Sequence, residues 1–312
     1  MSRARGSRPS GHWSALRAAA LARLIPRRKS ARVRSRPHQV GSHPGLARRA
    51  GFSESRDMAI PDTLAARLIE TVKSHDLGGK FLMLGRQRWI GSRRGASSRV
   101  FTQVMADHMP GVSEADLIPE GETYSEGFFG KLGFESIDSM DFSDFEKASI
   151  IQDLSADLPK KLERKFDVIY DGGTCEHIFD LPTAYRNIHK MLKPGGVLIG
   201  HSPCNNWVNH SFYQINPEMV YGFWEATLGY EVLHCALQPI KPAHARKVVT
   251  TTNPNVTGKR PRLSGSLAEG GIILDYAVRK PKRSTKSADK VYQSDYVNRW
   301  TAPEADGEED AA

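Results

Sequence analysis

The chain has 312 residues, enough to bury the core of one large α/β domain with extensions or of two small domains. Its formal charge of +9 comes from the N-terminus, because residues 1–57 hold fourteen basic and two acidic side chains, a net +12 that leaves −3 for residues 58–312. The charge therefore gives no support to nucleic-acid binding by the main domain, and no apolar run is long enough to cross a bilayer. We expect one cytoplasmic domain, residues 58–281, between two tails.

Residues 1–57 are rich in Arg, Ala, Ser and Pro, a composition that opposes a packed core. Three interpretations are open: a transit-like presequence with a short basic amphipathic helix in WSALRAAALARLI, a tail for nucleic acid or another acidic surface, or a disordered extension before a domain that begins at Met58. We favour the disordered extension, because the helical pattern breaks at Pro26. Residues 282–312 are predicted to form a polar tail with an acidic end.

The cysteines are Cys175, Cys204 and Cys235, an odd number without C-x-x-C spacing. This pattern supports neither a disulfide framework nor a zinc knuckle, and we expect reduced thiols.

The regular pattern begins with a helix at 61–77, whose apolar residues share one face and which ends before two glycines. Residues 80–84 are predicted to form a buried strand, and the loop GRQRWIGSRRG at 85–95 leads to a second helix around 100–105. Strand, glycine-containing loop and helix form the opening of a βα unit. Residues 110–133 lack clear periodicity and are interpreted as a loop insertion or lid.

Further strands are predicted at 134–138, 148–154, 166–171 and 197–203. The strand at 166–171 is apolar almost throughout, as expected of a strand covered on both faces. The clearest helix follows it, with Asp180 as its cap, an apolar stripe and the terminating sequence KPGG.

The C-terminal part is predicted to hold a helix from Pro217 to Gly229, capped by Asn216, and a closing strand pair at 230–237 and 271–278. A basic loop insertion, residues 241–269, separates the two strands. The alternation of strands and helices predicts a Rossmann-like α/β fold, a doubly wound, mostly parallel sheet with helices on both faces and a closing antiparallel strand pair. Ligands of such sheets bind beyond the C-terminal strand ends, so the strand-end residues are the functional candidates.

The run FDVIYDGGTCEHIFDLPTAYRNIHKMLKPGGVLIGHSP, residues 166–203, resembles the second half of a class I S-adenosylmethionine-dependent methyltransferase. It has a strand, a turn with Glu-His, an amphipathic helix, L-K-P-G-G and the next strand in the order of that family. ASIIQDLSADLP at 148–159 resembles the family's third-strand motif. The resemblance extends over about residues 62–280, and its second half is the more specific.

The resemblance implies S-adenosyl-L-methionine as the cofactor, held by strand-end residues. Asp138 would accept hydrogen bonds from the ribose hydroxyls, Asp153 would receive the adenine amino group, and Leu154 would pack against the ring. The glycine of the first loop, Gly85, would also border the cofactor. The methionine and methyl end would lie against Asp171, Gly172 and Gly173, where bare backbone allows close approach.

The first loop departs from the family pattern of an acidic residue and three closely spaced glycines. Gly85, Gly91 and Gly95 are too widely spread, and they do not form G-x-G-x-x-G either. Arg86 and Arg88 lie in this loop with two further arginines, Arg93 and Arg94. They either bind a phosphate or pyrophosphate on the acceptor, such as a nucleotide-linked sugar, or form an exposed basic loop, which is the interpretation we favour.

Methyl transfer is an in-line displacement, and a general base helps only when the acceptor is a hydroxyl that must lose its proton. His210 lies in NWVNHSFYQINPE, which resembles a segment of methyltransferases from glycan and secondary-metabolite pathways. We expect His210 to be this base, and Asn209, Tyr213 and Gln214 around it to bind the acceptor. His177, directly after the glycine turn, either catalyses or packs at the helix entry.

Glu176 has three open roles: to orient a histidine, to contact the methionine end of the cofactor or to cap the helix. Glu176 and His177 are adjacent, which makes a poor chelate, and the sequence shows no third ligand, so no metal site is predicted. Cys175 is not expected to be a nucleophile, because methyl transfer needs no covalent intermediate.

The sequence thus predicts an S-adenosylmethionine-dependent methyltransferase that acts on a small molecule or glycan, with O-methylation as the expected reaction. The first alternative is a catalytically inactive methyltransferase-fold protein with a binding or regulatory role, which direct cofactor binding and turnover would distinguish. The second is a nucleic-acid methyltransferase tethered by the leader, which is less favoured because no motif like N-P-P-Y follows the strand at 166–171.

Overall fold

The computed structural model describes residues 59–89, 95–117, 121–257, 262–263, 265–283, 290–293 and 296. The basic leader, most of the C-terminal tail, and Arg93 and Arg94 of the first loop lie outside these residues. The helices are α1 Asp62–Ser74, α2 Ala96–His108, α3 Glu114–Leu117, α4 Glu126–Leu132, α5 Leu181–Met191 and α6 Pro254–Thr257. A π-helix spans Met219–Thr227, and short 3₁₀ turns span Lys160–Leu162, Cys175–His177 and Pro242–His244.

The strands form one large sheet and one small parallel pair. Their bounds are β1 Ala59–Ile60, β2 Gly79–Leu84, β3 Arg88–Trp89, β4 Phe134–Asp141, β5 Ile150–Ile151, β6 Phe166–Asp171, β7 Leu192–Asn205, β8 Glu231–Pro239, β9 Val249–Thr250 and β10 Ile272–Arg279. The large sheet has the order β5-β4-β2-β6-β7-β10-β8-β9, and β1 pairs with β3. Strands β5, β4, β2, β6 and β7 are parallel, whereas β10 runs antiparallel to both β7 and β8. The predicted doubly wound, mostly parallel α/β fold with a closing antiparallel pair is confirmed.

Strand order reverses at β2. From β2 the chain proceeds outward through β4 and β5 on one side, and then returns to β6 and β7 on the other side. In such sheets the carboxyl ends of the strands flanking the switch point leave a crevice for a ligand. The loops after β2, β4, β5 and β6 are therefore the candidates for ligand binding.

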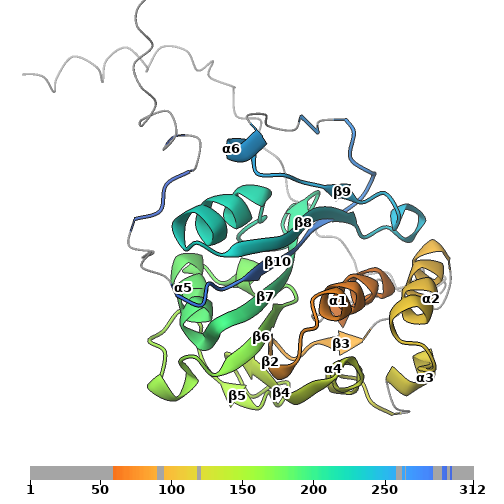
Figure 1. Cartoon of the computed structure of the whole chain (residues 1–312), viewed down its shortest axis with the longest axis horizontal. Coiled ribbons are helices and arrows are strands. Elements are labelled where there is room, and N and C mark those ends of the chain that lie inside the picture. The colour runs from red at the N-terminus through yellow and green to blue at the C-terminus, as the bar shows by residue number, and fades with distance from the viewer. Residues whose placement is uncertain are drawn as a thin grey trace, which may run out of the picture. The chain divides into compact units, whose positions relative to one another are not determined.

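Helices cover both faces of the sheet (Figure 1), with α1, α2 and α4 on one face and α5 on the other. Strand alternation explains the division, because successive side chains point to opposite faces. In β2, Leu82 and Leu84 pack with α5, whereas Phe81 and Met83 pack with α1 and α4. Both sets are fully buried, which accounts for the uninterrupted apolar sequence of this strand.

The helix α5 confirms the helix that the sequence predicts after Asp180. Asp180 precedes it, and the Asp180 side chain accepts a hydrogen bond from the backbone N–H of Thr183 at 3.3 Å. This is the N-cap that the sequence predicts. Five apolar residues of the predicted stripe are buried under the sheet: Leu181, Ala184, Tyr185, Ile188 and Met191.

The interpretation of residues 110–133 as a lid is wrong. The segment contains α3 and α4, and Phe128, Phe129 and Leu132 of α4 are buried in the same core as α1. The rings of Phe129 and Phe81 lie 4.2 Å apart, between centroids. Two turns of helix are too short for a clear period, so the sequence pattern is weak although the packing is tight.

Three other boundaries differ from the prediction. Strand β4 continues to Asp141 rather than ending at 138, and β5 has only two residues instead of the seven expected. The predicted helix at 217–229 is largely a π-helix, Met219–Thr227. π-Helices are rare and their hydrogen-bond pattern is not encoded in apolar periodicity, so the sequence predicts only a helix there.

A buried polar network joins α1 to the sheet. The Asp275 carboxylate of β10 accepts hydrogen bonds from Arg67 Nε at 2.6 Å, His234 Nε2 at 2.8 Å and His201 Nε2 at 3.2 Å. The other ring nitrogen of His201 lies 3.1 Å from Tyr170 Oη. Burial alone would raise the pKa of Asp275, but the hydrogen bonds from the two histidines outweigh it and hold that pKa well below its ordinary value.

Candidate functional site

A cavity of about 360 Å³ lies at the carboxyl ends of β4 and β5 and beside the turn after β6. Its volume is at the lower end of the range typical of small-molecule sites. Its lining residues come from three of the four segments at the switch point, those after β4, β5 and β6: Met140, Asp141, Phe142, Gln152, Asp153, Leu154, Thr174, His177 and Ile178.

Two carboxylates enter this cavity from neighbouring strand ends. Asp141 is the last residue of β4, and Asp153 follows β5 by two residues. Asp153 and Leu154, for which the sequence predicts cofactor contacts, both line this cavity. Asn187 of α5 fixes this segment, because its Nδ2 donates to the carbonyl of Leu154 at 2.9 Å.

Asp138 does not line the cavity in this structure. It lies three residues before the end of β4, where Lys165 Nζ approaches its Oδ2 to 3.1 Å and Ser149 Oγ donates to its Oδ1 at 2.9 Å. The sequence reasoning ended the strand too early, at the acid that closes FESID. The acid at the true strand end is Asp141.

The described part of the loop after β2 is held by hydrogen bonds to β4, to the turn after β6 and within the loop itself. The Gly85 N–H donates to the carbonyl of Met140 at 2.7 Å, and Gly85 adopts a φ of +64°, which favours glycine. The Leu84 carbonyl accepts from Gln87 Nε2 at 3.1 Å and from Thr174 Oγ1 at 2.7 Å. These contacts join the loop to β4 and to the turn after β6, and Gly85, predicted to border the cofactor, does not line the cavity.

The two described arginines of this loop contact acidic and aromatic side chains. Arg86 Nε lies 2.6 Å from Glu126 Oε1, and its guanidinium stacks 3.9 Å over the ring of Tyr124. Arg88 lies 3.5 Å from a Glu146 carboxylate oxygen. Neither arginine lines the cavity at the strand ends. These partners join the loop to α4 and to the segment after β4, so the contacts favour neither the phosphate site nor the exposed basic loop.

The turn after β6 is organised by Asp171. Its Oδ1 accepts from the backbone N–H groups of Thr174 at 3.0 Å and Cys175 at 3.2 Å, whereas its Oδ2 is buried without a hydrogen-bond partner. Gly173 has a φ of +106°, and a Cβ on Gly172 would lie 2.7 Å from the Tyr170 ring. Glycine at 172 is therefore required by packing even before a ligand is considered.

Glu176 is almost completely inaccessible, with 1% of its surface exposed, and neither carboxylate oxygen has a hydrogen-bond partner. Burial, and then the neighbouring charge of Asp171, raise the pKa of Glu176 well above its ordinary value. Three buried carboxylate oxygens without partners on one short turn are costly unless a proton or another cation compensates them.

His177 and His210 come together although 33 positions separate them. Their ring centroids lie 5.0 Å apart in an edge-to-face arrangement. Burial, and then His210, lower the pKa of His177, while Asp171 acts in the opposite direction. One carboxylate oxygen of Glu176 and one nitrogen of each imidazole all lie within 4.8 Å of one another. His210 thus adds a third possible ligand atom beside Glu176 and His177, which the sequence could not identify.

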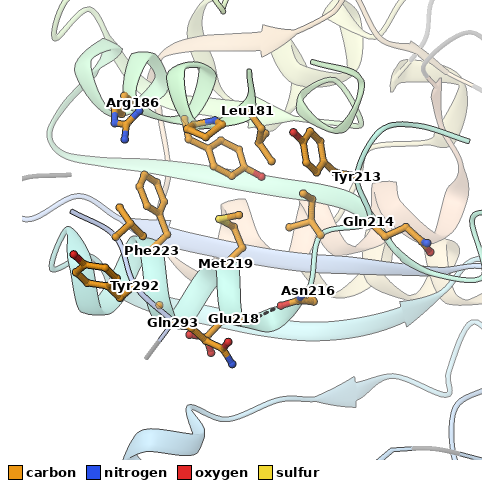
Figure 2. A pocket seen from close by; sticks show the side chains of 15 residues that line it. Leu181, Arg186, Tyr213, Gln214, Asn216, Glu218, Met219, Phe223, Tyr292 and Gln293 are labelled. Atoms are coloured by element: carbon orange, nitrogen blue, oxygen red, sulfur yellow. Dashed lines mark hydrogen bonds between the residues drawn. The ribbon is translucent and has the colours of Figure 1, made fainter. Parts of the chain in front are cut away.

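A second cavity, of about 700 Å³, lies between α5 and the π-helix. Figure 2 shows Leu181 and Arg186 from one side, Met219 and Phe223 from the other, and Tyr213 at one end. Tyr213 and Gln214, expected to bind an acceptor, line this cavity, whereas Asn209 does not. The sequence does not predict the cavity, because its walls come from three separate segments, residues 181–186, 213–223 and 291–293.

A comparison with protein families gives a match over part of the chain. Residues 130–198, which extend from α4 into β7, match the family model described as "Methyltransferase domain". This match confirms the resemblance over that segment. No curated protein sequence matches the chain.

Similar solved structures include those of three methyltransferases. The N-methyltransferase NodS from Bradyrhizobium japonicum, with S-adenosyl-l-homocysteine, has 12% identity and a TM-score of 0.35 over 69% of this chain and 85% of its own. An S-adenosylmethionine-dependent methyltransferase from Mesorhizobium loti has 14% identity and a TM-score of 0.35 over 70% and 98%. The 1,6-didemethyltoxoflavin-N1-methyltransferase from Burkholderia thailandensis has 14% identity and a TM-score of 0.29 over 70% and 80%.

None of the helices that the structure describes combines the length and the apolar character that a membrane span needs.

Proposed function

We propose that the protein is an S-adenosylmethionine-dependent methyltransferase that acts on a small-molecule acceptor, with a hydroxyl oxygen as the methyl acceptor. The observation that carries the proposal is the cavity at the switch point, where Asp141 and Asp153 approach from adjacent strand ends. An adenosyl group offers two ribose hydroxyls and an amino group, and carboxylates are strong acceptors for such donors. Leu154 and Ile178 supply apolar walls for the ring.

The turn after β6 suits the charged end of the same donor. S-adenosylmethionine supplies an electrophilic methyl group on a positively charged sulfonium. Asp171, buried with one oxygen unpartnered, is the carboxylate that we assign to this cationic end. The cavity reaches Thr174 but not Asp171, so full occupation requires the Thr174 contact with Leu84 to open.

We assign His177 and His210 to the part of the site where the acceptor hydroxyl loses its proton. His177 lines the donor cavity, and the ring of His210 lies beside it. The segment that carries His210 continues into Tyr213 and Gln214 of the second cavity, which we assign to the non-reacting part of the acceptor. This arrangement would hold the acceptor oxygen beside the donor methyl group and exclude water, the main requirements of methyl transfer.

The test is calorimetric titration of the full-length protein with S-adenosylmethionine and with S-adenosylhomocysteine. We expect one molecule of either ligand per chain, and the absence of binding by both would overturn the proposal. His210→Ala is expected to lower turnover on a hydroxylated acceptor much more than donor affinity. An equal loss of donor affinity would instead show that His210 supports the fold.

A catalytically inactive binding protein is the second candidate. The observation that favours an inactive protein is the loop after β2, in which Gln87 is buried and hydrogen-bonded to Leu84. This candidate predicts donor binding without methyl transfer to any hydroxylated acceptor in a panel. Methyl incorporation that disappears in His210→Ala would exclude it.

A further inference from the structure

Among the described residues, the carboxylate of Glu176 is unusual although it does not line the cavity at the strand ends. It is buried, and neither of its oxygens has a hydrogen-bond partner. Such a group is retained at a cost of stability unless it binds something. The partner has to be a cation or a proton.

Two imidazoles face this carboxylate. One ligand atom each from Glu176, His177 and His210 lies within 4.8 Å of the other two. Ligands of one divalent ion at about 2.0–2.2 Å are at most about 4.4 Å apart. Both imidazoles are exposed, so rotation of their rings can bring the nitrogens closer to the Glu176 carboxylate.

The loop that carries His210 is anchored on both sides. Trp207 Nε1 donates to the carbonyl of Ile272 at 3.0 Å, and the Trp207 N–H donates to Gln214 Oε1 at 3.2 Å. The Tyr213 N–H donates to the carbonyl of Glu176 at 3.2 Å, which joins the loop directly to the β6 turn. The position of His210 beside Glu176 is therefore held by the tertiary fold.

We propose that Glu176, His177 and His210 form a binding site for one divalent transition-metal ion, of the Zn²⁺ or Mn²⁺ type. Two neutral imidazoles and one carboxylate are the donor set that borderline divalent ions prefer, and they leave coordination positions open. The site adjoins the donor cavity through His177. The role of this metal site in methyl transfer rests on the proposed function, whereas the binding of the ion does not.

With an ion bound, His177 and His210 would act as metal ligands rather than as a general base. An acceptor hydroxyl bound at an open position would become more acidic, and its proton would pass to solvent. Its oxygen would then form a bond to the methyl carbon while the carbon–sulfur bond breaks and its electron pair stays on sulfur. The imidazoles serve as ligands in this scheme, so no protein base is needed.

The experiment uses the full-length protein without a histidine tag, treated with chelator and dialysed. Titration with Mn²⁺ followed by electron paramagnetic resonance, and with Zn²⁺ by calorimetry, is expected to show one ion per chain. His210→Ala and the nearly isosteric Glu176→Gln are expected to weaken binding by at least about 100-fold. His108→Ala, a substitution at the end of α2, is the matched control and keeps full affinity.

Thermal unfolding of the metal-free variants shows whether each one folds, so that loss of binding is not mistaken for loss of structure. Absence of stoichiometric binding by the intact protein, or full affinity in both site variants, overturns the site. Donor titration in the presence of chelator is the independent measurement. Donor binding without metal binding removes only this inference, whereas metal binding without donor binding removes only the proposed function.

Discussion

Asp141 and Asp153 face the same cavity from adjacent parallel strands, and each is fixed by the same local device. The Oδ1 atom of Asp141 accepts from the N–H of Ser143 at 3.0 Å, and that of Asp153 accepts from the N–H of Ser155 at 2.8 Å. Such turns, in which a side chain bonds the backbone two residues ahead, hold the carboxylate in place. The pair is therefore preorganised to receive hydroxyl and amino donors from a ligand.

The first prediction follows from that pair. Asp141→Asn and Asp153→Asn should each weaken S-adenosylmethionine binding by about 10- to 100-fold, because a hydrogen bond to a charged group is worth about 1.5–3 kcal/mol. Calorimetric titration measures the change. Asp138→Asn is the control and should leave the affinity unchanged, since Asp138 bonds Lys165 and Ser149 instead. A larger effect at Asp138 than at Asp141 would contradict the assignment of the strand end.

The buried network at Asp275 supplies the second prediction. Asp275→Ala removes the buried carboxylate that pairs with Arg67 and His234, although Arg67 keeps its contact with Glu70, and breaking a buried charge pair in this way costs about 3–5 kcal/mol. The free energy of unfolding in urea at neutral pH measures it. Asp107→Asn, on the exposed face of α2, should change this free energy by no more than about 0.5 kcal/mol. Equal effects of the two substitutions would show that the network contributes little.

The third prediction concerns acid stability. Burial, and then Lys280 and Lys190, lower the pKa of His189 to about 4. Because the folded pKa lies below the ordinary value of 6.5, the contribution of His189 is complete above pH 6.5 and is lost as the pH falls toward 4. His189→Gln removes this titration. We expect the unfolding free energy of the variant to fall less between pH 7.5 and about pH 5 than that of the original protein.

Urea unfolding at the two pH values tests this expectation. His75 and His177 also have lowered pKa values and contribute in the same direction, but they are present in both proteins. The difference between the proteins therefore isolates His189. An identical pH dependence in the two would show that His189 is solvated in the folded state.

The fourth prediction concerns glycines that the tertiary packing requires. A Cβ on Gly200 would lie 2.2 Å from the ring of Tyr276, which is fully buried. Gly200→Ala should therefore destabilise the protein by about 1–3 kcal/mol or more, through overpacking. Gly130→Ala in α4 is the matched control, because the nearest atom to its added Cβ is 3.7 Å away. It should be neutral or stabilising by up to about 1 kcal/mol, since alanine favours a helix. Thermal unfolding that ranks the two variants in the opposite order would refute this account.

Much of the fold could be predicted because it depends on local patterns. The strand at 166–171 and the helix that follows Asp180 are found where apolar runs, a cap and a period of 3.6 place them. Short or irregular elements were missed for the same reason. The helix α4 spans only two turns, and the π-helix shares its composition with an ordinary α-helix.

The candidate site could be predicted only in part. Asp153 and Leu154 follow a recognisable motif, and both line the cavity at the strand ends. Asp141 was not identified, because the sequence does not tell at which of two nearby acids a strand ends. The contacts of Arg86 with Glu126 and Tyr124 join residues about 40 positions apart, which no local pattern reveals.

By itself, the sequence determined the alternation of strands and helices, because burial on one or both faces leaves a period that can be read along the chain. Only the tertiary structure decided which polar residues meet. Glu176 and His210 are 34 positions apart, and they become neighbours because the turn after β6 and the loop after β7 emerge at the same edge of a parallel sheet. Distance along a chain carries no information on such a meeting, whereas strand order and direction impose it.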